Sequence, residues 1–162
     1  MKKMICILLA MLMFSSLALA EEANPFAPYA LILPDGANLE ESEGTCTVVE
    51  GMTRVVVTVI DRVPDENPAE AVIRMMTQFE PEAIIGADVP AAEGFTGLTA
   101  LHADRFGEGV DQMIVMVLSH EGDLLILSAY DLHGDREKAQ ALLDAILISL
   151  TVNDEPIVLT EE

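Results

Sequence analysis

Two aspartates and a histidine alternate at the point where an expected strand ends and an expected helix begins. Asp131, His133 and Asp135 occupy every second position of this stretch. Oxygen ligands are what hard cations such as Ca²⁺ and Mn²⁺ prefer, and an imidazole can join them. The loop FGEGV, which we expect to join two antiparallel strands, should lie at the same end of the sheet. The candidate cation ligands at this end are Asp104, Glu108, Asp111, Asp131, His133 and Asp135.

Two neighbours in sequence, His120 and Asp123, belong to the other end of the sheet. The strand expected from Asp123 to Tyr130 runs away from the tight hairpin turn that holds His120. A rise of about 3.3 Å per residue separates His120 from His133 by roughly 25 Å. Ligands of one zinc ion converge to about 2 Å from it. The two histidines therefore cannot share a metal within one chain.

The competing interpretation is a solvated end of the sheet followed by a helix start. Asp135 and Glu137 suit the positive end of a helix dipole, and acidic loops are expected in a chain whose formal net charge is −20. The sequence contains no glycine-rich phosphate loop, no G-x-S-x-G, no H-E-x-x-H, no C-x-x-C and no calcium loop of alternating acids. We therefore expect no catalytic residue and no cofactor, with a weak calcium or manganese site as the sharper alternative.

Two helices should help to position these residues. Asn67 is a predicted N-cap, Pro68 suits the first helical position, and Glu70 stands three residues after the cap. Helical spacing then puts Val72, Ile73, Met76 and Phe79 on one face. The second helix is predicted from Asp135 to Leu150, with an apolar stripe made of Ala139, Leu142, Leu143, Ile146, Leu147 and Leu150.

The remaining apolar segments predict a mostly antiparallel sheet. The expected strands are Tyr29 to Leu33, the hairpin of Cys46 to Glu50 and Thr53 to Asp61, a brief strand at Ile84-Ile85, and a meander of Leu98 to Arg105, Gln112 to Ser119 and Asp123 to Tyr130. The runs VVVTVI, MIVMVL and LLILSA are apolar at successive positions, which is typical of strands covered on both faces. Since two helices can cover one face, we expect the other to need the N-terminal segment, the loop 82–97 or a second subunit.

The N-terminal residues have the pattern of an export signal. Lys2 and Lys3 precede an apolar run, and Ala18-Leu19-Ala20 suits cleavage before Glu21. The predicted organisation is a signal peptide at 1–20, a linker at 21–28, one α/β domain at 29–152 and an acidic C-terminal tail at 153–162. We expect an exported protein with no stable membrane anchor after cleavage.

The net charge limits the classes of partner, and the cysteine content limits how the domain can be stabilised. A formal charge of −20 disfavours nucleic acid and anionic membrane surfaces, because like charges repel. Cys46 would be the one cysteine left after cleavage, so the domain must hold together without an internal disulfide. The simplest role for Cys46 is that of a small strand residue, and a reactive thiol is the alternative.

The order of elements resembles a known family. A strand ending in a proline turn (LILPDGA) precedes a hairpin, a helix, a three-stranded meander and a closing helix that ends in LLDAILISL. This order resembles the PsbP-like family of small exported or lumenal domains. The resemblance implies an α+β fold, arranged as an α/β/α sandwich. It also implies a binding or assembly role without shared catalytic residues.

These observations favour an exported, non-enzymatic binding or accessory module whose partner is an unknown protein or small ligand. One alternative is an extracytoplasmic hydrolase or metal-dependent enzyme with a site that the sequence does not reveal. Another is a homodimer that covers an exposed face of the sheet with its second copy.

Overall fold

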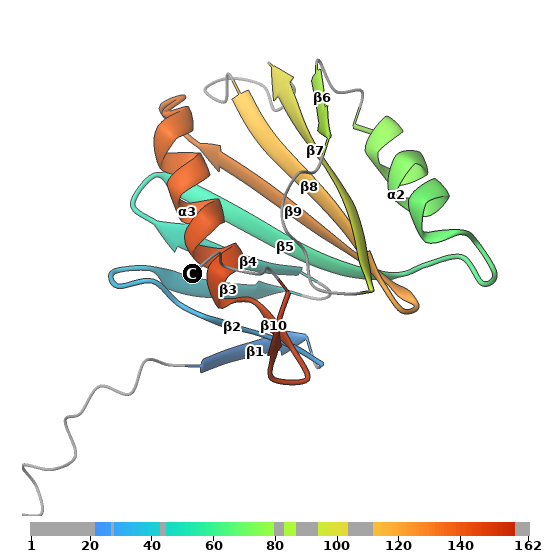
Figure 1. The fold of residues 1–162 in the computed structure, drawn as a ribbon. Coiled ribbons are helices and arrows are strands. Elements are labelled where there is room, and N and C mark those ends of the chain that lie inside the picture. Colours follow the sequence, from blue (N-terminus) through green and yellow to red (C-terminus); the bar gives the residue numbers. More distant parts are fainter. Residues whose placement is uncertain are drawn as a thin grey trace, which may run out of the picture.

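A seven-stranded antiparallel sheet forms the centre of the molecule (Figure 1). The computed structural model describes residues 22–26, 28–42, 45–79, 83–86, 94–103 and 112–157. Their elements are β1 (Glu22–Phe26), β2 (Tyr29–Ile32), β3 (Asn38–Ser42), β4 (Thr45–Glu50), β5 (Thr53–Asp61), α2 (Pro68–Thr77), β6 (Ala83–Gly86), β7 (Phe95–Ala103), β8 (Gln112–His120), β9 (Asp123–Asp131), α3 (Arg136–Ser149), β10 (Thr151–Val152) and β11 (Glu155–Pro156). The large sheet has the order β3-β4-β5-β9-β8-β7-β6. This is the α+β class that the sequence predicts.

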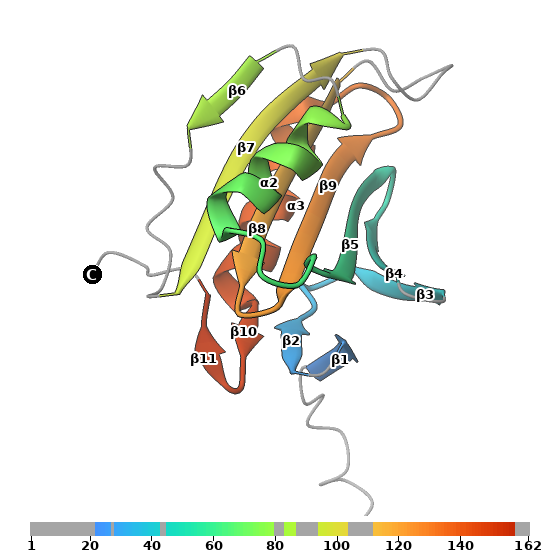
Figure 2. The same ribbon diagram turned by 90° about the vertical axis from the view of Figure 1, so that its right-hand side faces the viewer.

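One helix covers each face of this sheet, which makes the molecule an α/β/α sandwich. In Figure 2, α2 lies in front of the sheet and α3 behind it. The expectation that both helices could share one face is therefore wrong, because each helix has its own core cluster. Val72 and Met76 of α2 pack with Val115 of β8, whereas Leu143 and Ile146 of α3 pack with β2, β4, β5, β8 and β9.

The central strands are apolar at successive positions because both of their faces are covered. In β8, Ile114, Met116 and Leu118 belong to the core cluster beside α3. The intervening Met113 and Val117 belong to the cluster beside α2. Side chains alternate between the two faces of a strand, so the run MIVMVL contributes to two cores. This confirms the interpretation of these runs as central strands.

The hairpin of β4 and β5 forms as predicted. Glu50 pairs with Thr53 across a turn at Gly51 and Met52. Gly51 has a φ of +58°, a backbone conformation that glycine adopts without the steric cost of a Cβ. This turn fixes the position of the Met52 side chain, which is half exposed.

A small second sheet closes the end of the molecule near the C-terminal end of α3 (Figure 1). Its order is β1-β2-β10-β11. Most of the expected linker 21–28 is thus a strand. The expected tail begins with a turn at 153–154 and continues as β11, followed by Ile157, which has 0% exposure. Short strands depend on backbone pairing with distant segments, so EANPF and EP carry no apolar pattern that would reveal them.

Helix α2 begins as predicted but presents a different face to the sheet. Asn67 Oδ1 accepts hydrogen bonds from Ala69 N at 2.9 Å and Glu70 N at 3.4 Å. The buried residues are Ala71, Val72, Met75 and Met76. Ile73, expected on the buried face, is 52% exposed, because it lies about 160° around the helix from the buried Met75.

Within these described ranges, neither helix combines the length and the apolar character that a bilayer crossing requires. The predicted signal peptide, residues 1–20, lies outside them.

Candidate functional site

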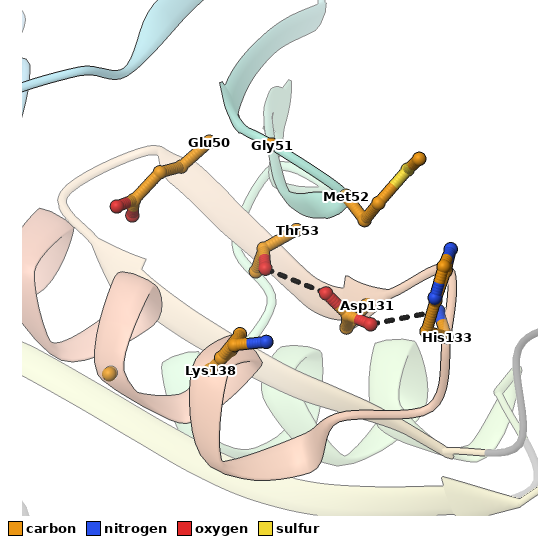
Figure 3. A pocket seen from close by; sticks show the side chains of 8 residues that line it. Glu50, Gly51, Met52, Thr53, Asp131, His133 and Lys138 are labelled. Atoms are coloured by element: carbon orange, nitrogen blue, oxygen red, sulfur yellow. Dashed lines mark hydrogen bonds between the residues drawn. The ribbon is translucent and has the colours of Figure 1, made fainter.

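A hollow of about 470 Å³ opens where the β4–β5 turn, the end of β9 and the first turns of α3 meet (Figure 3). Two stretches far apart in the sequence contribute to its wall: the β4–β5 turn, and the run from the end of β9 into α3. The lining residues are Glu50, Gly51, Met52, Thr53, Asp131, His133, Lys138 and Ala141. It contains two of the six predicted cation ligands.

Asp131 is a buried carboxylate at the base of this hollow. Its side chain is 3% exposed, and Oδ2 accepts a hydrogen bond of 2.8 Å from Thr53 Oγ1. Oδ1 accepts hydrogen bonds from the backbone N–H of His133 at 2.8 Å and of Asp135 at 3.3 Å. Burial alone would raise the pKa of Asp131, but these three donors and the charge of Lys138 outweigh it and lower the pKa.

Asp135 caps α3, as the sequence indicates. Its Oδ1 accepts a hydrogen bond from Lys138 N at 3.2 Å, and its Oδ2 lies 2.9 Å from Lys138 Nζ. The hydrogen bond from the Lys138 side chain, followed by that from its backbone N–H, lowers the pKa of Asp135. The same pairing raises the pKa of Lys138. The charge of Lys138 is thus already matched by a partner.

His133 joins this site mainly through its backbone. Its N–H binds Asp131 while its side chain is exposed and lies on the far side of Asp131 from Thr53 (Figure 3). Asp104, Glu108 and Asp111 lie outside the described residues. The strand residues on either side of that segment, Ala103 and Gln112, pair with each other.

In the portion of the chain that the structure describes, no group of three or more His, Cys, Asp or Glu residues is placed to hold a metal ion. The calcium or manganese hypothesis therefore depends on residues outside that portion.

The structure places His120 at the opposite end of β9, where it pairs with Asp123. Its ring stacks on Phe95 with centroids 4.2 Å apart and meets Tyr29 edge-on at 6.4 Å. Tyr29 Oη donates a hydrogen bond of 2.9 Å to Asp123 Oδ2. Burial, followed by this hydrogen bond, raises the pKa of Tyr29. Sequence spacing separated the two ends correctly but gave no signal for this aromatic contact.

Arg62 lies near the same β8–β9 turn. Its backbone N–H donates to Gly122 O at 2.7 Å, and its Nη2 donates to Glu121 O. Nη1 is buried and has no hydrogen-bond partner among the described residues. These contacts attach the segment after β5 to the turn.

Cys46 is a buried strand residue, as expected. Its exposure is 0%, and burial, followed by the charge of Glu41, raises its pKa to about 11. Since the thiolate is the reactive form, these surroundings suppress its nucleophilicity.

Glu50 and Met52 are among the residues of the hollow that sequence reasoning missed. Both are exposed, and Leu132 N donates to Met52 O at 3.0 Å, which joins Met52 to a second exposed apolar residue beside the hollow's lining. The turn at Gly51 was recognisable in the sequence. Its contact with α3, which begins more than eighty residues later, was not.

Solved structures of three small proteins share this architecture. No protein-family model matches the sequence, and no curated protein matches it. The cyanobacterial PsbP protein CyanoP from Synechocystis sp. PCC 6803 is similar, with a TM-score of 0.58 and 14% identity over 85% of this chain and 96% of that one. LpqN of Mycobacterium tuberculosis, described as involved in cell envelope biogenesis, has a TM-score of 0.53 and 17% identity over 85% and 87%.

The Ran-binding protein Mog1p of Saccharomyces cerevisiae is also similar, with a TM-score of 0.52 and 13% identity over 83% of this chain and 95% of that one. The fold is PsbP-like. The resemblance in element order therefore predicted the architecture correctly. At such low identity these likenesses establish the fold and leave function to the site itself.

Proposed function

We propose that the protein is an exported, non-enzymatic accessory module that binds a protein partner at the hollow beside the β4–β5 turn. The observation that carries this proposal is the exposed Met52 in the lining of the hollow, together with the exposed Leu132 that is bonded to it. Met52 is 50% exposed and Leu132 is 40% exposed, and their backbones are hydrogen-bonded to each other. Exposed apolar side chains that adjoin a hollow are the features that protein partners cover.

The ionisable groups of the hollow also favour binding over catalysis. A general acid or base works best with a pKa near the working pH. Here the pKa of Asp131 is lowered and that of Lys138 is raised, so both shifts move away from neutrality. Both groups are engaged in hydrogen bonds that build the start of α3. They serve as the rigid base of a binding surface.

The fold and the leader sequence support the remaining parts of the proposal. A protein of the same fold, Mog1p, is described as Ran-binding, and LpqN is described as involved in cell envelope biogenesis. The leader of this chain, with its basic start and small residues before Glu21, supports export. An accessory protein outside the cytoplasm is consistent with both.

A capture experiment followed by reconstitution tests the proposal. The protein, purified after expression of the full chain, is used as bait in envelope extracts of its source, and any captured protein is purified for calorimetry. Replacing Met52 or Leu132 by Glu should weaken the affinity by about tenfold, the usual effect of truncating a central contact.

Ile73→Glu is the matched control, because Ile73 is 52% exposed and lies on α2, which covers the other face of the sheet. This control should leave the affinity unchanged. Loss of affinity in Ile73→Glu to the same degree as in Met52→Glu, or the absence of any saturable binding, would overturn the proposal.

A further inference from the structure

Glu50 is the one carboxylate of the hollow that no described group neutralises. It is exposed, and its carboxylate lies on the other side of Thr53 from Asp131 (Figure 3). The ion pairs among the described residues join Arg74 to Glu66 and Lys138 to Asp135, so Glu50 takes part in neither. A carboxylate without a partner at the wall of a hollow is available to a ligand from solution.

The local charge favours a cation as that ligand. The ammonium of Lys138 lies 2.9 Å from Asp135, and the lowered pKa of Asp131 keeps that carboxylate charged beneath Thr53. Glu50, Asp131 and Asp135 are thus three carboxylates in this part of the molecule. The described cations near them are Lys138 and Arg54, whose Nη1 donates a hydrogen bond to Gly51 O at 2.8 Å. The whole chain, with a formal charge of −20, adds a long-range field that attracts positive partners and increases their association rate.

Two exposed apolar residues, Met52 and Leu132, indicate that the ligand also carries an apolar group. Met52 lines the hollow, and Leu132 is joined to Met52 through its backbone. A space of about 470 Å³ is within the range of about 300–1,000 Å³ that ligand sites occupy. It is large enough for one long side chain of a partner, while methionine at the rim adapts to several apolar shapes.

We propose that the hollow takes a partner segment in which a lysine or arginine stands close to an aliphatic residue. The basic side chain pairs with Glu50, and the aliphatic residue packs on Met52 and Leu132. This inference rests on the proposed function, since it names the chemistry of the partner at the same hollow. A second copy of this acidic chain is a poorer occupant, because two such surfaces repel each other.

A selection from random peptides tests this chemistry directly. The protein, purified after expression of the full chain, is immobilised and panned against a phage library of random short peptides, with counter-selection on a Met52→Ser/Leu132→Ser variant. The enriched peptides should place Lys or Arg within a few residues of Leu, Ile, Val or Met.

For a synthetic copy of such a peptide, Glu50→Gln should weaken binding by about fivefold. The salt dependence of binding should fall in the same variant, because one ion pair is lost. Glu155→Gln is the matched control, since Glu155 is an exposed carboxylate of β11, beyond the other end of α3. It should leave the affinity unchanged.

The outcomes separate the two proposals. Two results would overturn this inference and leave the hollow as a binding site. In one, the enriched peptides fail to bind the Met52→Ser/Leu132→Ser variant but carry no basic residue. In the other, a peptide binds the wild type and Glu50→Gln with equal affinity. If the enriched peptides bind the Met52→Ser/Leu132→Ser variant as well as the wild type, or if no peptide is enriched, the hollow is not the binding site. Either result overturns both this inference and the proposed function.

Discussion

At the scale of single residues, Asp131 combines burial with a retained charge. Three hydrogen bonds converge on its carboxylate, from Thr53 and from the N–H groups of His133 and Asp135. Such charge-assisted bonds are roughly twice as strong as neutral ones. The carboxylate therefore joins the β5–β9 ladder to the segment that leads into α3.

Replacement of Asp131 by Asn should lower the free energy of unfolding by about 2 kcal/mol at pH 7, in keeping with hydrogen bonds to a charged group. The folded-state pKa of Asp131 is lowered. Its contribution is therefore complete above the unfolded pKa of about 3.9 and disappears as the pH falls through the folded pKa. Urea unfolding at pH 7 and at pH 3 measures both effects.

Thr53→Val is the control for a single bond, and it should cost about 1 kcal/mol. A difference between wild type and Asp131→Asn that stays constant from pH 7 to pH 3 would contradict this account.

At the scale of elements, the small sheet is part of the folded domain. Thr151 and Val152 of β10 pair with Ala30 and Tyr29 of β2. Ile157, just after β11, is fully buried in the cluster that α3 covers. The C-terminal boundary of the domain therefore lies at or beyond Ile157, later than apolar periodicity indicates.

Ile157→Ala should destabilise the protein by about 2 kcal/mol, the lower range for truncating a buried isoleucine. Ile148→Ala is a matched control, because Ile148 of α3 is 60% exposed and its truncation should change the stability by less than about 0.5 kcal/mol. Thermal unfolding monitored by circular dichroism compares the two. Equal shifts would mean that residues after β10 do not contribute to the core.

The same elements show how far the sequence could predict the structure. Asn67-Pro68 indicated the start of α2, the stripe from Ala139 to Leu150 indicated α3, and continuous apolar runs indicated β5, β8 and β9. These signals are local. Strands β1, β3, β10 and β11 were missed, because they are short and their stability depends on backbone pairing.

In the candidate site, too, some residues could be predicted from a local sequence pattern and others could not. Asp135 at the start of α3 was predictable from local pattern. The bond from Thr53 to Asp131 joins residues 78 positions apart, and the hollow exists only because the β4–β5 turn meets α3. No local pattern encodes that meeting, so Glu50 and Met52 stood out only in the structure.

At the scale of the whole molecule, the main feature is a large excess of negative charge. The sequence has 28 acidic residues against 8 basic ones, and the described ion pairs involve only Arg74 with Glu66 and Lys138 with Asp135. Most carboxylates therefore repel one another across the surface. Such self-repulsion opposes the compact state and discourages self-association.

Added sodium chloride should therefore stabilise the fold. Raising the salt from about 0.01 M to about 0.3 M shortens the screening length from roughly 30 Å to below 10 Å. We expect the melting temperature to rise by about 4 °C, equivalent to about 1 kcal/mol. Differential scanning calorimetry measures it, and the rise should level off once screening is complete. A flat response would show that repulsion contributes little.

The pairing of β2 with β10 has a practical consequence for protein engineering. It brings β2 and β10 side by side, with Tyr29 opposite Val152, so that the first strand β1 and the last strand β11 of the described residues lie in the same small sheet, at its two edges. The hollow lies at the far end of α3, a helix of 14 residues that spans about 21 Å. Circular permutation should therefore be tolerated here. A fluorophore or surface tether joined to either segment would leave the end that carries the hollow unobstructed.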